Sequence, residues 1–541
     1  MSLSTMGAQL KQNWKSALSV ALVSVPLSLS LSIASGAGPI PGIIAAIWAG
    51  LIAGLMGGSK FNIVGPAGAL SGILATYALT YGPGVLPVIA LGAGVLTLII
   101  WVLKWDKYLI FVPSSVIHGF TLGVALTIGF GQLNFALGLS GLPVHEHLYQ
   151  NVIESFSHIG SAYGVSILTF IVGLGAMFGL LKWKPKVPNT VVLAVLGIIF
   201  GFLASTGKLP FTIPTLFSRY GDLSLSLFSI PRIGRDMLSL GVLQASAVVA
   251  FVVVLETLIS AKVADGMTKT KFNQRKEVLG VGLANLASGI FGGIPASGVF
   301  ARTAINVKSG ATSSWSQVIN AVLVALIAIV FLPYFKYLPL PIIASILVYA
   351  AIRMVNREHF DRLYRHDKAA FWNAMAIAVI TIAYDATAGI LVGMLVALFV
   401  FARRLSNAQC HITASDGKQQ CVIDSTDDER IKDRTVIYRF GGELTYITAK
   451  SHIERIHRIE GDKAIILNFK NLFYIDADGV EALEEIAEDL ARRGQQVYIT
   501  SVREHLVGFF EESEWYRHLR HEGGIHPTTF DALRAADPSV K

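Results

Sequence analysis

The 541-residue chain is too apolar to be a string of soluble domains, with 53% hydrophobic and 15% charged residues, where globular proteins average about 25% charged residues. The charges are unevenly distributed, because the last 141 residues hold 19 of the 44 Lys and Arg residues and 24 of the 36 Asp and Glu residues. The basic residues of the first part lie between apolar runs, so the net charge of +8 indicates a membrane protein rather than a nucleic-acid-binding one.

Apolar segments of membrane-spanning length follow one another from about residue 16 to residue 402. A helix needs about 20 apolar residues to cross a hydrocarbon core of ~30 Å. About fourteen segments are predicted, several of them short, at residues 16–35, 38–57, 61–79, 85–103, 113–133, 163–182, 188–206, 242–262, 277–292, 296–308, 316–333, 338–352, 370–385 and 387–402.

The positions of the basic residues predict how these segments are oriented. Clusters of Lys and Arg follow the fourth, sixth, eighth and twelfth segments, at residues 104–107, 182–186, 269–276 and 353–368. Cytoplasmic loops are enriched in Lys and Arg, so the pattern predicts an even number of spans with both termini in the cytoplasm. The loop at residues 207–240 is an exception, since it is expected outside yet contains Arg232 and Arg235.

The third and tenth segments are interrupted where the centre of a helix would lie. The third contains Gly65 and Pro66, and the tenth region reads GGIPASG at residues 292–298. Proline suits the start of a helix but disrupts its interior, so each segment is predicted to be a short extended stretch followed by a half-helix. Matched broken spans in two halves indicate a midplane binding site, and two helix N-termini favour an anion there.

Two charged residues lie close to these interruptions in the predicted arrangement. Glu256 is in the eighth apolar segment, and a carboxylate at that depth marks an ion or proton pathway. Arg302 lies one turn into the second half-helix. It either adds positive charge near the anion or pairs with a carboxylate to hold the structure, and the sequence leaves both roles open.

The polar part of the chain has the pattern of a small α/β domain. Strands are predicted at residues 435–440, 464–469 and 496–501, and helices at 447–457, 478–493 and 503–513. The predicted organisation is a membrane domain at 1–404, a linker at 405–430 and the α/β domain at 431–541. Cys410 and Cys421 both lie after residue 400 and indicate no disulfide framework.

These motifs together resemble the SulP family of anion transporters, the bacterial relatives of solute carrier family 26. The resemblance rests on VALVSVP at residues 20–26, VGPAGA at 64–69 and VIHGF at 116–120, and most specifically on residues 256–265, 292–298 and 302–306. The polar part is similar to a STAS domain, the fold of anti-sigma-factor antagonists, through FYIDADGV at residues 473–480.

The resemblance implies a polytopic helical fold of fourteen segments in two inverted repeats of seven, with core and gate domains, an elevator-like cycle and a homodimer. It also implies where the anion binds, between segments one, three, eight and ten. The implied anion-binding residues are Pro26, Leu27, Leu31, Gly65, Pro66, Ala67, Ser297, Gly298, Val299, Phe300, Ala301 and Arg302. Glu256 and Ser260 are implied to couple a proton or cation to transport.

Several positions depart from the family pattern. Leu27 replaces a glutamine that many relatives carry, so the site is expected to be less polar on that side. Glu256 replaces the aspartate of the sodium-coupled bicarbonate carriers, and Phe300 lies where those carriers have a hydroxyl residue. Both differences favour protons over sodium. Asp478 replaces the serine that antagonists phosphorylate, which argues against a phosphorylation switch.

The predicted function is secondary active transport of a small inorganic anion, sulfate or bicarbonate, by proton symport. The alternatives left open are a sodium-coupled bicarbonate symporter, an anion exchanger or channel, and a dicarboxylate transporter of the same fold. A nucleobase transporter is disfavoured because such proteins lack a STAS domain. A sensor is disfavoured because the tail contains no catalytic output motif. The expected location is a bacterial cytoplasmic membrane, with both termini, the STAS domain and an unidentified STAS partner in the cytoplasm.

No enzymatic motif is found in the sequence. A phosphate-binding loop of the form GxxxxGK[ST] and an HExxH zinc motif are both absent. His145 and His147 accompany Glu146 and Glu154 in a loop predicted outside the membrane, where solvation is a better interpretation than metal binding. Neither an enzyme nor a resident cofactor is therefore expected, and H⁺ or Na⁺ would enter only as a co-transported ion.

Overall fold

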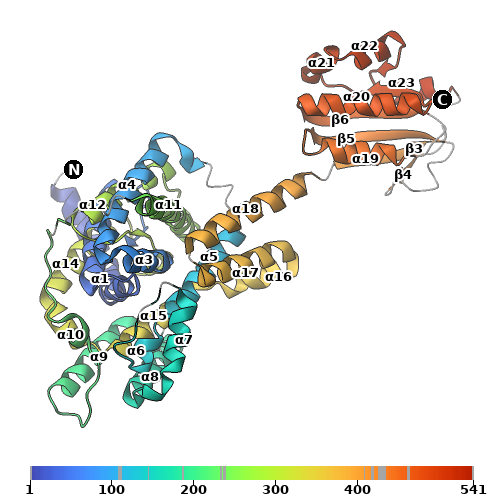
Figure 1. Cartoon of the computed structure of the whole chain (residues 1–541). Helices are drawn as coiled ribbons and strands as arrows, with labels where there is room; N and C mark the ends of the chain where they lie inside the picture. Colours follow the sequence, from blue (N-terminus) through green and yellow to red (C-terminus); the bar gives the residue numbers. More distant parts are fainter. Residues whose placement is uncertain are drawn as a thin grey trace. The chain divides into compact units, whose positions relative to one another are not determined.

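The computed structural model describes residues 3–107, 113–143, 145, 147–184, 188–228, 230–231, 234, 239–384, 386–406, 409–415, 420–423, 434–459 and 464–538. Two compact units make up the chain, Met1–Ala397 and Leu398–Lys541. Figure 1 colours the chain along its sequence, and the second unit is the part in orange to red.

Each of the fourteen predicted apolar segments contains a helix. Eight helices within the described residues are long and apolar enough to cross a membrane. The helices that correspond to the predicted segments are α1 (Leu3–Ala34), α2 (Pro39–Met56), α3 (Gly68–Tyr81), α4 (Leu86–Val102), α5 (Ser114–Phe130), α8 (Gly164–Trp183), α9 (Asn189–Ser205), α11 (Leu240–Thr268), α12 (Gln274–Ile290), α13 (Phe300–Lys308), α14 (Trp315–Phe335), α15 (Leu340–Met354), α17 (Lys368–Ala383) and α18 (Ala386–Leu405).

Short helices also form in connections that were predicted only as polar loops. They are too short or too polar to be recognised as apolar segments. Of the charged loop residues named above, four lie outside the described residues: Arg232, Arg235, Lys186 and Glu146. These helices are α6 (Leu133–Leu137), α7 (Leu148–Ser157), α10 (Leu216–Tyr220) and α16 (Arg357–His366), with 3₁₀ turns at Pro83–Val85 and Ile159–Ser161.

The helices of the first unit pack in two groups. In the first group, α12 packs on α2 and α4, α14 packs on α1 and α2, and α11 packs on α4. In the second group, α17 packs on α5, and α15 packs on α5 and α8. Each group combines helices from the first and second halves of the unit, which is the arrangement expected for core and gate domains built from inverted repeats.

Small residues allow the helices of the first group to approach closely. Gly42 of α2 faces α1, where a Cβ atom would lie 2.2 Å from the carbonyl oxygen of Ser28. The hydroxyl of Ser32 accepts from the backbone N–H of Gly42 at 2.9 Å and donates to the carbonyl of Gly38 at 2.6 Å. This contact fixes α1, which carries Pro26 within its length, against α2.

The second unit is a six-stranded mixed sheet with helices on its faces (Figure 1). The strand order is β4-β3-β5-β6-β7-β8, with β5 to β8 parallel and β3 antiparallel to both of its neighbours. The elements are β3 (Gln409–Ser415), β4 (Gln420–Ile423), β5 (Thr435–Leu444), α19 (Ala449–His457), β6 (Ile465–Ile475), α20 (Ala477–Arg492), β7 (Val497–Thr500), α21 (Glu504–Glu511), α22 (Glu514–His521), β8 (Ile525–His526) and α23 (Thr529–Ala536).

Alternation along β5 separates the two faces of this sheet. Tyr438 and Phe440 belong to the main core, together with residues of α19, α20 and α21 such as Ile486. Ile437, the residue before Tyr438 on the strand, packs instead with Leu533 of α23. Successive side chains of a strand point to opposite faces, so α23 covers the face opposite the other helices.

The segment 405–430, predicted as a linker, differs from that expectation. Residues 409–415 form β3, which pairs along its whole length with β5, and residues 420–423 form β4 at the sheet edge. Pairing with a strand more than twenty residues later is a tertiary property, and the polar composition of the segment gave no sign of it. Residues 416–419 and 424–433 lie outside the described part of the chain.

Candidate functional site

The two interrupted segments meet through a short pair of strands. β1 (Val64–Gly65) pairs antiparallel with β2 (Ser297–Gly298), with Val64 opposite Gly298 and Gly65 opposite Ser297. The backbone N–H of Val299 extends the pairing by donating to the carbonyl of Ile63 at 2.9 Å. Because α3 begins at Gly68 and α13 at Phe300, both half-helices start directly after the paired strands.

Arg302 joins one half-helix to the break before the other. Its side chain is almost completely buried, with 1% of its surface exposed, and its Nη2 donates to the carbonyl oxygen of Pro66 at 2.7 Å. Its Nε has no hydrogen-bond partner among the described residues. A Cβ atom at Gly65 would lie 2.5 Å from Nη1, so the guanidinium lies directly against β1.

Glu256 of α11 lies beside β2. The hydroxyl of Ser297 donates to Oε2 of Glu256, and the next residue, Gly298, donates its N–H to Oγ1 of Thr257 at 2.9 Å. Ser297 is fully buried, whereas Glu256 is half-buried. The ion pairs found among the described residues do not include Glu256 with Arg302, so the carboxylate and the guanidinium make no direct contact.

The hydroxyl of Ser260 is hydrogen-bonded to other side chains of the protein. Its hydroxyl donates to Oδ1 of Asn62 at 2.7 Å and lies 3.1 Å from Oγ1 of Thr303. It is buried one helical turn beyond Glu256 on α11. In this arrangement Ser260 ties α11 to the residues that lead into β1 and α13.

The remaining predicted residues divide between buried and exposed positions. On α1, which packs against α3 and α13, Pro26 and Leu31 are buried and Leu27 is half-buried. Pro66 and Ala67 are buried at the first break. At the start of α13 the side chain of Phe300 is 51% exposed, and that of its neighbour Ala301 is also exposed.

Four polar residues that the sequence analysis did not single out complete the site. Asn62, Thr257, Glu277 and Thr303 are all buried, with exposed fractions of 6%, 0%, 3% and 1%. Their hydrogen bonds connect α11, α12 and α13 to residues 62 and 63, immediately before β1. Apolar surroundings in the sequence were the available signal for Asn62, Thr257 and Thr303, since a buried polar side chain needs partners, whereas Glu277 follows a basic loop.

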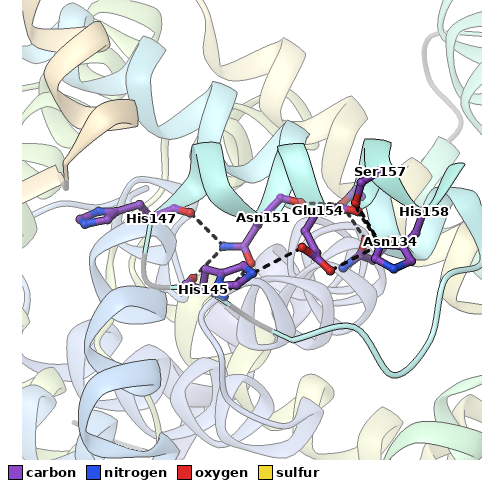
Figure 2. A network of polar contacts seen from close by, with 8 residues as sticks. Asn134, His145, His147, Asn151, Glu154, Ser157 and His158 are labelled. Atoms are coloured by element: carbon purple, nitrogen blue, oxygen red, sulfur yellow. Dashed lines mark hydrogen bonds and ion pairs between the residues drawn. The ribbon is translucent and has the colours of Figure 1, made fainter.

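The loop that the sequence predicts to be external holds a polar network at the start of α7 (Figure 2). Asn151 donates to the carbonyl of His145 at 2.7 Å and accepts from its N–H at 2.8 Å. The carboxylate of Glu154 lies 3.8 Å from Nε2 of His145 and 3.4 Å from Nδ1 of His158. Within the described residues no group of three or more His, Cys, Asp or Glu side chains could hold a metal ion.

Asp478 is an exposed residue in the first turn of α20. Asp476 caps this helix, because its side chain accepts from the N–H of Gly479 at 2.9 Å. Asp478 also lines a groove of about 580 Å³ between α19 and α20, together with Tyr446, Glu454, His457, Glu481 and Glu485. Four of the ten residues that line the groove are acidic and one, Lys450, is basic.

Comparison with known protein families agrees with this geometry. The family model described as the sulfate permease family matches residues 10–377. The chain belongs to the sulfate permease family. A STAS domain model matches residues 428–532, which confirms the resemblance of both units to a SulP transporter with a C-terminal STAS domain.

Relatives within the sulfate permease family align along most of the chain. The putative sulfate transporter YvdB of Bacillus subtilis (strain 168) is 31% identical, over 91% of this chain and 93% of that protein. The bicarbonate transporter BicA of Picosynechococcus sp. is 26% identical, over 89% of this chain and 87% of that protein. The chain is therefore a multi-pass membrane protein from a family of anion transporters, not of enzymes.

Solved structures share the fold of this chain. The murine solute carrier 26 family member A9 anion transporter in the inward-facing state matches with a TM-score of 0.83 at 12% identity, covering 98% of this chain and 92% of that one. The transmembrane domain of a cyanobacterial bicarbonate transporter BicA matches with a TM-score of 0.61 at 24% identity, covering 72% of this chain and 97% of that one.

Proposed function

We propose that the chain is a secondary active transporter of a small inorganic anion, sulfate or bicarbonate. The observation that carries the proposal is the pairing of β1 with β2, which brings the starts of α3 and α13 together. A helix N-terminus carries about half a positive charge, and its free N–H groups bind anions. Two such ends beside the buried Arg302 favour a negatively charged substrate.

Arg302 supports the anion site in two ways. Its guanidinium keeps its positive charge in proteins, and one of its N–H groups holds the carbonyl of Pro66 in place at the opposite break. Its Nε–H group has no partner among the described residues and is available to an oxyanion. In this proposal Arg302 contributes charge and also holds structure, through the carbonyl of Pro66 rather than through the carboxylate partner that the sequence left open.

Glu256 supports coupling to protons. Its carboxylate lies on an apolar helix and accepts from Ser297, three residues before Phe300, where α13 begins. A negative charge at this place would repel an anion bound at the half-helices. Protonation of Glu256 removes that repulsion, so a proton and an anion would enter together. The hydroxyl of Ser260 donates to Asn62 and contacts Thr303, which gives Ser260 a structural role in the site.

The proposed cycle is an elevator-like movement of one helix group against the other. The candidate site lies on α1, α3, α11 and α13, which pack on one another. The site can therefore move as a unit past the group of α5, α8, α15 and α17. We propose a homodimer in a bacterial cytoplasmic membrane, with both termini in the cytoplasm and the acidic groove of the STAS domain available to a regulatory partner.

Uptake by reconstituted protein tests this proposal. Liposomes containing the purified full chain are given labelled sulfate or bicarbonate under an inward proton gradient without sodium. The wild type is expected to accumulate one of these anions, and Glu256→Gln is expected to lose gradient-driven accumulation. Glu154→Gln makes the same chemical change in the external network and is expected to behave as the wild type.

Sodium dependence would contradict the proton mechanism. Accumulation that begins only when sodium is added would favour the second candidate, sodium-coupled bicarbonate transport, whose substrate is that of the similar bicarbonate transporter BicA. Accumulation by Glu256→Gln equal to that of the wild type would remove Glu256 from the coupling mechanism. Transport of neither anion under either condition would overturn the proposed substrates.

A further inference from the structure

We propose that Asn62, held by Glu277, is the positioning residue that sets the geometry of the anion site. This inference rests on the proposed function, because it concerns the same site. Asn62 lies two residues before β1 and is 6% exposed. Its side chain reaches three helices, α11, α12 and α13, and neither Asn62 nor Glu277 is among the residues that the family resemblance implies.

The amide of Asn62 uses its full hydrogen-bonding capacity. An Asn side chain offers two N–H donors and a carbonyl oxygen with two lone pairs. Nδ2 donates to Oε1 of Glu277 at 2.7 Å and to the carbonyl of Thr257 at 3.2 Å. Oδ1 accepts from Ser260 at 2.7 Å and from Thr303 at 3.0 Å. Each donor and each acceptor site of the amide therefore has a partner on α11, α12 or α13.

Glu277 orients the amide of Asn62. It is 3% exposed in the first turn of α12, and its Oε2 accepts from the backbone N–H groups of Gly58 and Ser59, each at 2.7 Å. With Oε2 committed to these two donors, Oε1 presents only an acceptor to Asn62. The amide must therefore turn its NH₂ group towards Glu277 and its oxygen towards Ser260 and Thr303.

The orientation of Asn62 affects Glu256 and Arg302 through two contacts. Thr257, whose carbonyl accepts from Asn62, also accepts the N–H of Gly298 at its Oγ1. Ser297, next to Gly298, donates to Glu256. On the other side, Thr303 lies one residue beyond Arg302 and accepts from the N–H of Ile63, adjacent to β1. A change in Asn62 would therefore shift both charged groups of the site.

Exchanging the two partners tests this role. Asn62→Asp places two carboxylates against each other. Glu277→Gln replaces one carboxylate oxygen by an NH₂ group, which then faces either the NH₂ group of Asn62 or the backbone N–H groups of Gly58 and Ser59. Each single variant is expected to lower anion uptake about tenfold or more, the size of a strong pairwise coupling. The double variant keeps the volume and the total charge and restores a donor facing an acceptor between residues 62 and 277, but not the hydrogen bond to the carbonyl of Thr257, so its uptake should recover part of the loss.

The measurements separate positioning from general stability. Melting temperature and size-exclusion profile report folding, while the pH profile of uptake and the rise in melting temperature with sulfate, bicarbonate or chloride report the site. The single variants are expected to shift the pH profile and lose the anion-dependent rise, and the double variant to regain both. Gln317→Leu, which removes a hydrogen bond to Val64 on the same strand, is the matched control and is expected to change stability alone.

Two results would overturn the inference. One is that the single variants keep the wild-type pH profile and anion-dependent melting. The other is that the double variant folds but stays as inactive as the single ones. A wild type that transports neither sulfate nor bicarbonate but is stabilised by one of the anions would refute the proposed function, and the melting assay would still test the positioning role. A wild type with no anion response at all would overturn both.

Discussion

His452 of the STAS domain makes the stability of the second unit depend on pH. It is 1% exposed, its Nδ1 lies 2.8 Å from the hydroxyl of Tyr438, and burial, assisted by Arg455, lowers the pKa of His452 from 6.5 to about 4. The unfolded chain binds a proton first as the pH falls, so stability is complete above pH 6.5 and decreases towards pH 4. The decrease is about 1.4 kcal/mol per pH unit, or about 3 kcal/mol in total.

Hydrogen exchange in the full chain, corrected for intrinsic rates, measures this loss in β5 and α19. The variant His452→Gln cannot titrate and is expected to remove most of the pH dependence between 6.5 and 4. His457→Gln is the matched control, because His457 lies on the same helix with 39% of its side chain exposed, next to Asp489. An unchanged pH dependence in His452→Gln would mean that other groups cause the loss.

At the level of single residues, the sequence indicated the charged members of the site but not the polar ones. Glu256 and Arg302 are unusual by type alone, since ionisable residues are rare in apolar segments. Asn62 and Thr303 are common residue types, and their importance arises from hydrogen bonds across 195 to 241 positions of sequence. Glu277 follows a basic loop and is indistinguishable from a solvated helix cap until its partners are known.

At the level of elements, apolar runs predicted the helices and glycine with proline predicted the two breaks. The expected extended stretches form β1 and β2, and each is followed by a half-helix. The elements that the sequence did not predict have no apolar run. The ten-residue helix α16 has no buried residue, and β3 and β4 become strands because β5 lies beside β3.

The strand pair at the break requires glycine at Gly298. A Cβ atom there would lie 2.6 Å from Nδ2 of Asn62 and 2.9 Å from Cα of Thr257. Gly298→Ala must therefore push β2 away from α11, which is expected to cost about 1–3 kcal/mol and to abolish most anion uptake. Gly266→Ala is the control, because nothing lies within 4 Å of a Cβ atom at that exposed helical position and alanine favours the helix. Melting temperature and uptake of both variants distinguish the two sites, and wild-type uptake by Gly298→Ala would refute the close contact.

At the level of the whole molecule, the two units have separate hydrophobic cores. Among the described residues, the buried side chains of the first core lie between Ala21 and Ala397. Those of the two cores of the second unit all lie at or after Ile412. A unit with its own core can fold by itself. The sharp change in charge near residue 400 reflects this division, since an aqueous domain needs a charged surface and a membrane domain avoids one.

Removal of the second unit tests this independence. A chain that ends after Leu405 is expected to insert, to elute as a single species in size exclusion and to keep the anion-dependent rise in melting temperature of the full chain. A chain that ends after Ala383 also loses α18, which contributes Ile390 and Ala397 to the first core. This shorter chain is expected to melt lower, because the van der Waals packing of Ile390 and Ala397 in the first core is lost. If both truncations aggregate alike, the STAS domain is required for the membrane unit to fold; if only the shorter one does, the boundary of the membrane unit lies after α18.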